Sequence, residues 1–163
     1  MRHLATLTLF CATLLCSAQD SDDRLPFAVS VTANGAEADR FTVTLYKDNE
    51  QVVELPPSEH GAFELALEFN AQFSIRISKA GYRDKVLAVN TEVPPGSGSE
   101  ELIVYTVDLE PMDRFAHADP FYLDFPSALV QWDEATGEFT HSERYLANIQ
   151  LKMALLSAQA EAE

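Results

Sequence analysis

The sequence predicts a mainly β fold: an antiparallel β-sandwich followed by a C-terminal strap, a short strand and one α-helix. Apolar and polar residues alternate along residues 63–69 and again along 73–77, so each segment has one apolar face and one polar face. The short turn Asn70-Ala71 lies between the two segments, which predicts an antiparallel hairpin at the centre of the chain. Similar short segments bounded by turn residues recur from residue 27 to residue 109, as is typical of a sandwich.

The remaining strands of the sandwich follow from the same alternation and from the turns that end it. We expect strands at 27–33, 40–47, 51–55, 82–90 and 101–109, in addition to the central pair. Pro56-Pro57 is expected to end the third of these segments, because proline cannot donate a backbone hydrogen bond. Gly61 and Gly81 are expected to hold conformations that disfavour other residues, with a positive φ at Gly61. The residues expected in the core include Val43, Phe63, Leu65, Phe73, Ile75 and Ile77.

Residues 1–18 have the features of a secretory signal peptide. Arg2 and His3 form a basic start, residues 4–15 are apolar, and Cys16-Ser17-Ala18 places small residues before a cleavage point at Gln19. The apolar run is too short to span a bilayer. A lipoprotein anchored at Cys16 is the alternative, although such an anchor prefers a small residue in the preceding position. We therefore expect an exported protein of the periplasm or the cell surface.

Cysteine and charge content limit the possible partners of the exported chain. Both cysteines, Cys11 and Cys16, lie in the leader, so the mature chain is expected to form no disulfide. Loss of Arg2 with the leader changes the formal net charge from −15 to −16. A chain of this charge is repelled by nucleic acid and by anionic lipid, and it suits a cationic protein surface or a divalent ion. Improved solubility is the simpler explanation of the same charge.

The segment 19–25 is predicted to be a flexible acidic leash between the leader and the sandwich. Its aspartates, Asp20, Asp22 and Asp23, lack the glycine and glutamate that complete a calcium-binding loop. A solvated run of charge is the favoured interpretation.

Three motifs within residues 26–112 resemble those of carboxypeptidase regulatory-like domains. The segment 59–65, Glu-His-Gly-Ala-Phe-Glu-Leu, is similar to an entry strand of that family, and Ile77-Ser-Lys-Ala-Gly-Tyr82 is similar to a strand that ends in Lys-x-Gly-Tyr. Val107-Asp-Leu-Glu-Pro111 resembles the closing strand. The resemblance implies an Ig-like or transthyretin-like sandwich of seven strands in which Gly61, Phe63, Gly81 and Tyr82 determine the fold. It also implies a non-catalytic module of an exported or envelope protein.

The last segment, 113–163, is expected to add a strap, a short strand and a helix to the sandwich. The strap carries Pro120 and Pro126 and is expected to press its aromatic residues on the sandwich. The strand is predicted at 128–133, followed by a turn at Ala135-Thr136-Gly137. Thr140 and Glu143 form a capping box, which predicts a helix from that point to about Ala158. The strap aromatics are Phe115, Phe121, Tyr122 and Phe125.

The predicted helix has two apolar sides. The wider stripe is expected to pack on the sandwich beside Trp132 and Phe139, and it comprises Tyr145, Leu146, Ile149, Met153 and Leu156. The opposite, weaker stripe is a candidate contact for a protein partner or a second copy of the chain, and it comprises Ala147, Leu151, Leu155 and Ala158. Two singly exposed leucines, which soluble proteins tolerate, are the alternative interpretation.

The sequence contains no pattern of catalytic or metal-binding residues. The spacing of His60, His117 and His141 does not match a zinc site, and Ser142 beside His141 lacks an orienting acid supplied by any motif. Glu64 and Glu68 lie on the polar face of one strand, where a flat sheet provides no cleft for a glycosidase pair. We expect no cofactor, no metal ion and no enzymatic activity.

Two classes of function follow from these observations. The favoured one is a non-enzymatic exported module that binds a protein partner or has a structural role in the cell envelope. The alternative is a weak envelope hydrolase with a site assembled from scattered residues, or the accessory subunit of such an enzyme. A deep pocket with convergent acids would favour the enzyme, whereas an exposed apolar patch would favour the binding module.

Overall fold

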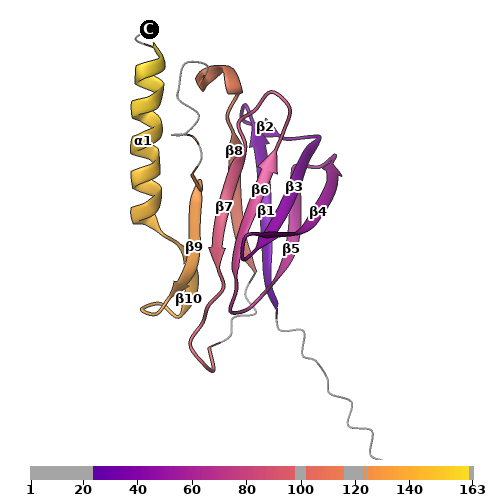
Figure 1. Cartoon of the computed structure of the whole chain (residues 1–163), viewed down its shortest axis with the longest axis vertical. Helices are drawn as coiled ribbons and strands as arrows, with labels where there is room; N and C mark the ends of the chain where they lie inside the picture. Colours follow the sequence, from indigo (N-terminus) through magenta and orange to yellow (C-terminus); the bar gives the residue numbers. More distant parts are fainter. Residues whose placement is uncertain (1–23, 98–101, 116–122, 124, 162–163) are drawn as a thin grey trace, which may run out of the picture.

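The computed structural model describes residues 24–97, 102–115, 123 and 125–161, which form two packed β-sheets and one long helix (Figure 1). The expected leader, its cleavage point at Gln19 and the alternative anchor at Cys16 lie outside the described residues. Most of the acidic leash, His117, Phe121 and Tyr122 also lie outside them. Within the described part, no helix is long and apolar enough to span a membrane.

The first sheet is built around one central strand. One edge of β1 pairs with β5 and with the two-residue strand β2, and the other edge pairs with β8. The second sheet is wider and has the order β10-β9-β7-β6-β3-β4. The elements are β1 Arg24–Ala33, β2 Ala36–Glu37, β3 Phe41–Lys47, β4 Glu50–Ser58, β5 Ala62–Glu68, β6 Gln72–Ser78, β7 Lys85–Asn90, β8 Ile103–Leu109, η1 Met112–Phe115, β9 Ala128–Asp133, β10 Glu138–His141 and α1 Glu143–Glu161.

The predicted sandwich is confirmed, but the predicted hairpin between its two central strands is wrong. Strand β5 pairs with β1 in the first sheet, whereas β6 pairs with β3 and β7 in the second. The chain changes sheets at Asn70, whose φ is 58°. Thr91 fixes this corner, because its hydroxyl donates to the Glu68 carbonyl at 2.7 Å and accepts from the Ala71 N–H at 3.0 Å.

The expectation of a purely antiparallel sandwich also requires correction. Strand β8 runs parallel to β1, and β9 runs parallel to β7. A parallel pair needs a long connection between its strands, and both pairs have one. The connection from β7 to β9 includes η1 and the strap, and this pairing brings the last part of the chain onto the edge of the second sheet (Figure 1).

Several element boundaries differ from the sequence prediction. Strand β4 continues through Pro56-Pro57, which a strand bonded only to β3 tolerates at the edge of its sheet. The predicted strand 82–90 begins at Lys85, and Tyr82 forms only an isolated bridge to Pro111. Thr140 lies in β10, a strand that the sequence interpretation missed, so it is not the helix cap.

Helix α1 is capped by Ser142 rather than by Thr140. The Ser142 hydroxyl accepts a hydrogen bond from the Tyr145 N–H at 3.3 Å, which satisfies one of the unpaired donors at the start of the helix. The Ser142 carbonyl accepts from Leu146 N–H at 2.9 Å. The helix therefore begins at Glu143, two residues later than the capping-box prediction implies.

The core lies between the two sheets and contains almost every residue that the alternation assigned to it. Leu65 is only partly buried, although it packs against the core, and Glu64 is exposed as expected. Phe63 contacts Phe41 with ring centroids 6.2 Å apart. The predicted core residues that are buried are Val43, Phe63, Phe73, Ile75 and Ile77.

The two glycines have different structural roles. Gly81 has a φ of 82°, as expected for a position that disfavours other residues. The expected positive φ at Gly61 is wrong, and the requirement there is steric. A Cβ atom on Gly61 would lie 2.1 Å from Glu37 Cγ and 2.9 Å from the Val31 carbonyl oxygen. Tyr82 follows Gly81, and its hydroxyl accepts a hydrogen bond from Asn34 Nδ2 at 2.7 Å.

Helix α1 packs on the molecule through the predicted wider stripe. Ile149 and Leu156 are buried, and the Tyr145 hydroxyl donates to the Pro126 carbonyl at 2.7 Å. The strap aromatic Phe115 is also buried, as expected, and Phe125 is partly buried. The opposite stripe is exposed, and its proposed partner role stays a prediction. Its members are Ala147, Leu151, Leu155 and Ala158.

Candidate functional site: a cleft beside the free edge of β8

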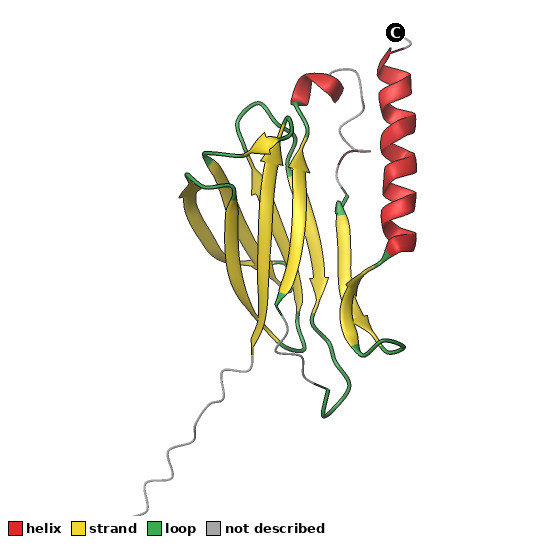
Figure 2. Cartoon of the chain, turned by 180° about the vertical axis from the view of Figure 1, so that it is seen from behind, coloured by secondary structure: helices red, strands yellow, loops and turns green. Residues whose placement is uncertain are grey.

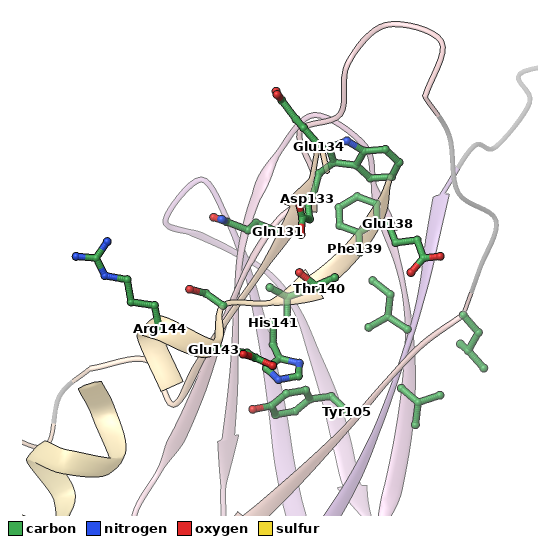
Figure 3. A pocket seen from close by; sticks show the side chains of 16 residues that line it. Tyr105, Gln131, Asp133, Glu134, Glu138, Phe139, Thr140, His141, Glu143 and Arg144 are labelled. Atoms are coloured by element: carbon green, nitrogen blue, oxygen red, sulfur yellow. The ribbon is translucent and has the colours of Figure 1, made fainter. Parts of the chain in front are cut away.

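A large cleft lies where the second sheet extends past the first. Strands β9 and β10 continue the second sheet beyond β8, and together with α1 they form one flank of the molecule (Figure 2). The cleft between β8 and the β9–β10 hairpin has a volume of about 830 Å³. It is lined by β8, by both strands of the hairpin and by the first residues of α1 (Figure 3).

The floor of the cleft is aromatic. Phe139 lies opposite Trp132, and His141 lies opposite Val130, in the antiparallel register of β9 and β10. Cross-strand partners share one face of a sheet, so all four side chains face the cleft. The Trp132 and Phe139 rings meet edge to face with centroids 5.3 Å apart, and Phe139 also lies 6.3 Å from the ring of Phe69.

Tyr105 of β8 forms the opposite wall of the cleft. Its ring meets the His141 imidazole edge to face at 6.4 Å, and Figure 3 shows the two side chains next to each other. Desolvation by burial raises the pKa of the Tyr105 phenol above its ordinary value. The phenol therefore stays protonated at neutral pH and provides a neutral hydroxyl at the wall.

The hydrogen bonds of β1 show which side of β8 is left open. Val31 donates to the Gly61 carbonyl at 2.7 Å and accepts from the Ala38 N–H at 3.0 Å, on the edge of β1 that bears β5 and β2. Backbone groups point to alternate edges along a strand. Ser30 and Thr32 therefore direct their backbone groups to β8.

Within the part of the chain that the structure describes, the alternate residues of β8 consequently present their backbone groups at an edge that carries no further strand. Ser30 lies opposite Thr106 in a parallel pair, so the backbone groups of Ser30 bond to the residues on either side of Thr106. The backbone N–H and C=O groups of Val104, Thr106 and Asp108 therefore point away from β1. Beyond the strand, the Glu110 carbonyl accepts from the Arg83 N–H at 2.9 Å on this same outer side. Among the described residues, β8 itself pairs only with β1.

Acidic side chains surround the cleft. Glu134, Glu138 and Glu143 are exposed and Asp133 is partly exposed, whereas Arg144 is the basic counterpart among the lining residues. Figure 3 shows Glu134 and Arg144 directed away from the aromatic floor. The carboxylates come from the last residue of β9, from the hairpin turn, from β10 and from the first turn of α1.

The cleft contains residues that the sequence interpretation did not assign to a site. His141 is exposed, as expected, but it ends β10 rather than starting the helix, and it lines the cleft. The available signal was the alternation of Phe139 and His141 with polar neighbours after the turn that ends at Gly137. The candidate partner residues Leu151 and Leu155 do not line this cleft. Within the described residues, no cluster of three or more His, Cys, Asp or Glu is arranged to hold a metal ion.

Comparison with known proteins shows likeness of structure only. No protein-family model matches the chain, and no curated protein matches it. The crystal structure of S.CueP is similar at 15% identity and a TM-score of 0.40, over 54% of this chain and 62% of that one. Catechol 1,2-dioxygenase from Acinetobacter sp. ADP1, inhibited by bound mercury, is similar at 9% identity and a TM-score of 0.40, over 58% of this chain and 55% of that one. The matches thus span less than two thirds of either neighbour, and they carry no functional assignment.

Proposed function

We propose that this chain is a non-enzymatic, exported binding module of the cell envelope that acts through protein–protein contacts, with the cleft beside β8 as its recognition site. The observation that carries the proposal is an aromatic floor lying next to a strand edge with open backbone groups. Clefts lined by aromatic residues and unpaired strand edges are both frequent sites of protein recognition. The leader-like residues 1–18 and the resemblance to carboxypeptidase regulatory-like domains support export and an accessory, non-catalytic role.

The arrangement of the cleft favours binding over hydrolysis. A hydrolytic site needs a base and a second group directed at one reacting atom. In this cleft the ring contact of His141 is with Tyr105, and the carboxylates are spread along an exposed rim. The alternative of an accessory subunit of an envelope hydrolase remains compatible with the same cleft, because the catalytic residues would then belong to the partner.

A peptide-display selection on the purified mature chain tests the proposal. We expect selected peptides to bind the wild type and to lose about ten-fold or more in affinity to Trp132→Ala, since aromatic residues dominate binding energy at such contacts. Tyr105→Ala tests the opposite wall, and Leu151→Glu is the matched control outside the cleft, at a side chain that is 61% exposed. Circular dichroism checks that each variant is folded. Peptides that bind Trp132→Ala and Tyr105→Ala as well as the wild type would contradict the proposal, as would their cleavage by the wild type in mass spectra.

A further inference from the structure

We propose that the cleft binds an extended, cationic segment of a partner protein as an added β-strand along the free edge of β8. This inference rests on the proposed function and names the chemistry of its ligand. The first sheet ends at β8, whereas the second continues through β9 and β10. A strand added beside β8 would extend the first sheet over the aromatic floor that β9 and β10 provide.

The free edge supplies a repeating set of backbone donors and acceptors. Val104, Thr106 and Asp108 each present an N–H and a C=O away from β1, spaced by two residues along the strand. This pattern pairs with an extended peptide through main-chain bonds, which provide affinity without requiring a particular sequence. Three such positions match a peptide segment of about five to seven residues.

The two faces of an added strand would meet different surroundings. Side chains on its inner face would pack on the floor formed by Trp132, Phe139 and His141. Side chains on its outer face would lie beside Val104, which is 66% exposed, and Leu102, which is 48% exposed. Cross-strand neighbours of this kind stabilise sheet pairs. A ligand with apolar residues at every second position therefore fits the cleft.

The charge of the rim selects a cationic ligand. The rim contributes four carboxylates, from Asp133, Glu134, Glu138 and Glu143, against the guanidinium of Arg144. Complementary charge on a ligand both steers encounter and fixes register, so a lysine-rich or arginine-rich segment suits this acidic rim. An acidic ligand would be repelled.

The same charge argues against a second copy of this chain as the occupant. Edge pairing of two β8 strands would bring two acidic rims together, in chains that each have a formal net charge of −15. The opposite edge of the second sheet offers a contrast, because β4 carries Pro56 and Pro57, residues that protect edge strands from such pairing. The sequence of β8 contains neither proline nor lysine.

Backbone methylation of a defined peptide tests the inference. The probe is a fluorescent peptide of about nine residues that alternates valine with lysine, a length that covers the free edge when extended. Two further versions carry N-methyl groups on the valines or on the lysines, so each blocks the amides on one edge of the peptide. We expect binding of the parent peptide, a loss of about ten-fold or more in affinity for one methylated version, and little change for the other.

Comparison peptides and exchange measurements complete the test. Replacement of lysine by glutamate should abolish binding, and the parent peptide should slow amide hydrogen exchange at Val104 and Thr106. Equal binding of the two methylated versions would overturn strand addition, and equal binding of the glutamate peptide would overturn the charge argument. Sedimentation that shows a dimer with these two amides protected in the absence of peptide would make a second copy the occupant.

The two proposals fail in different ways. If display selects peptides that require Trp132 but no alternating peptide binds, strand addition of a cationic segment is wrong and the recognition cleft stands. If display selects no peptide whose binding depends on the cleft, both proposals fall. Val104→Pro, which removes one outward N–H, and Val104→Thr, which keeps it, form a matched pair of protein variants for the same comparison.

Discussion

At the scale of single residues, Glu110, which follows β8, forms ion pairs with Arg83 and Lys85 near the packing surface of α1. Its carboxylate lies 2.5 Å from Lys85 Nζ and 3.5 Å from Arg83 Nη1. The Arg83 guanidinium is buried between Phe115 and Phe125, and its Nη1 lies 3.1 Å from Met153 Sδ of α1. Burial lowers the pKa of Arg83, and the Glu110 charge acts in the opposite direction. Glu110 thus stabilises the charge of a largely desolvated cation.

We predict that Glu110→Gln lowers the free energy of unfolding by about 2–4 kcal/mol, because it leaves Arg83 buried without its carboxylate partner. Urea denaturation followed by tryptophan fluorescence measures the change. Asp39→Asn is the matched control, since it removes a carboxylate that pairs with Lys79 but is itself 57% exposed, and it should move the midpoint much less. Equal destabilisation by the two variants would show that the Glu110 ion pairs contribute no more to stability than the Asp39 pair.

A second prediction at this scale concerns the stability of Gly61 variants. The added Cβ of Gly61→Ala would meet Glu37 Cγ and the Val31 carbonyl, and displacement of Glu37 would disturb its hydrogen bond from the Gly61 N–H at 2.7 Å. We expect a loss of roughly 1–3 kcal/mol in the free energy of unfolding, with a larger loss for Gly61→Val. Thermal and urea unfolding measure it. A Gly61→Ala protein as stable as the wild type would show that the site expands without cost.

At the scale of elements, the two sides of α1 should respond differently to charge. Leu151 and Leu155 are 61% and 58% exposed, whereas Ile149 is 7% exposed. We predict that Leu151→Glu combined with Leu155→Glu leaves the melting temperature nearly unchanged, while Ile149→Glu lowers it by several degrees or more through the burial of a charge. Calorimetry makes the comparison. Loss of stability in the double variant would mean that this side of the helix is covered.

The faces of the strands were predictable from the sequence, but their partners were not. Alternation along residues 63–69 and 73–77 assigns each side chain to a face, and the burial of Phe63, Phe73 and Ile75 confirms it. The same pattern fits either a hairpin or a change of sheet. In the structure, Thr91, which lies outside both segments, bonds to the corner where the chain changes sheets, and local alternation does not encode this contact.

The cleft could not be predicted from local sequence patterns, because it also depends on which strands pair. It requires β9 to pair in parallel with β7 across a long connection, which is a non-local contact that alternation does not encode. The aromatic character of Trp132 and Phe139 was visible in the sequence, but not their position beside β8. The apolar stripes of the helix could be predicted because they depend only on residue spacing along the helix. The burial of Ile149 and Leu156 agrees with the wider stripe.

At the scale of the whole molecule, export is a prediction from residues 1–18, and a cationic partner is our proposal from the acidic rim of the cleft. We predict that the protein isolated from its native host begins at Gln19, because residues 1–18 have the layout of a cleaved leader. Mass spectrometry of the intact protein measures this. A diacylated N-terminal Cys16 would instead make the protein a membrane-anchored lipoprotein.

The central claim is that the cleft beside β8 is the recognition site, and one measurement tests it most directly. Amide and indole chemical shifts of the isotope-labelled chain are recorded with and without a peptide from the display selection. The account predicts that the largest changes fall on Val104, His141 and the Trp132 indole, on both walls of the cleft, and on Thr106 further along the same edge of β8. Changes concentrated around Leu151 and Leu155 of α1, with the cleft residues unaffected, would contradict it.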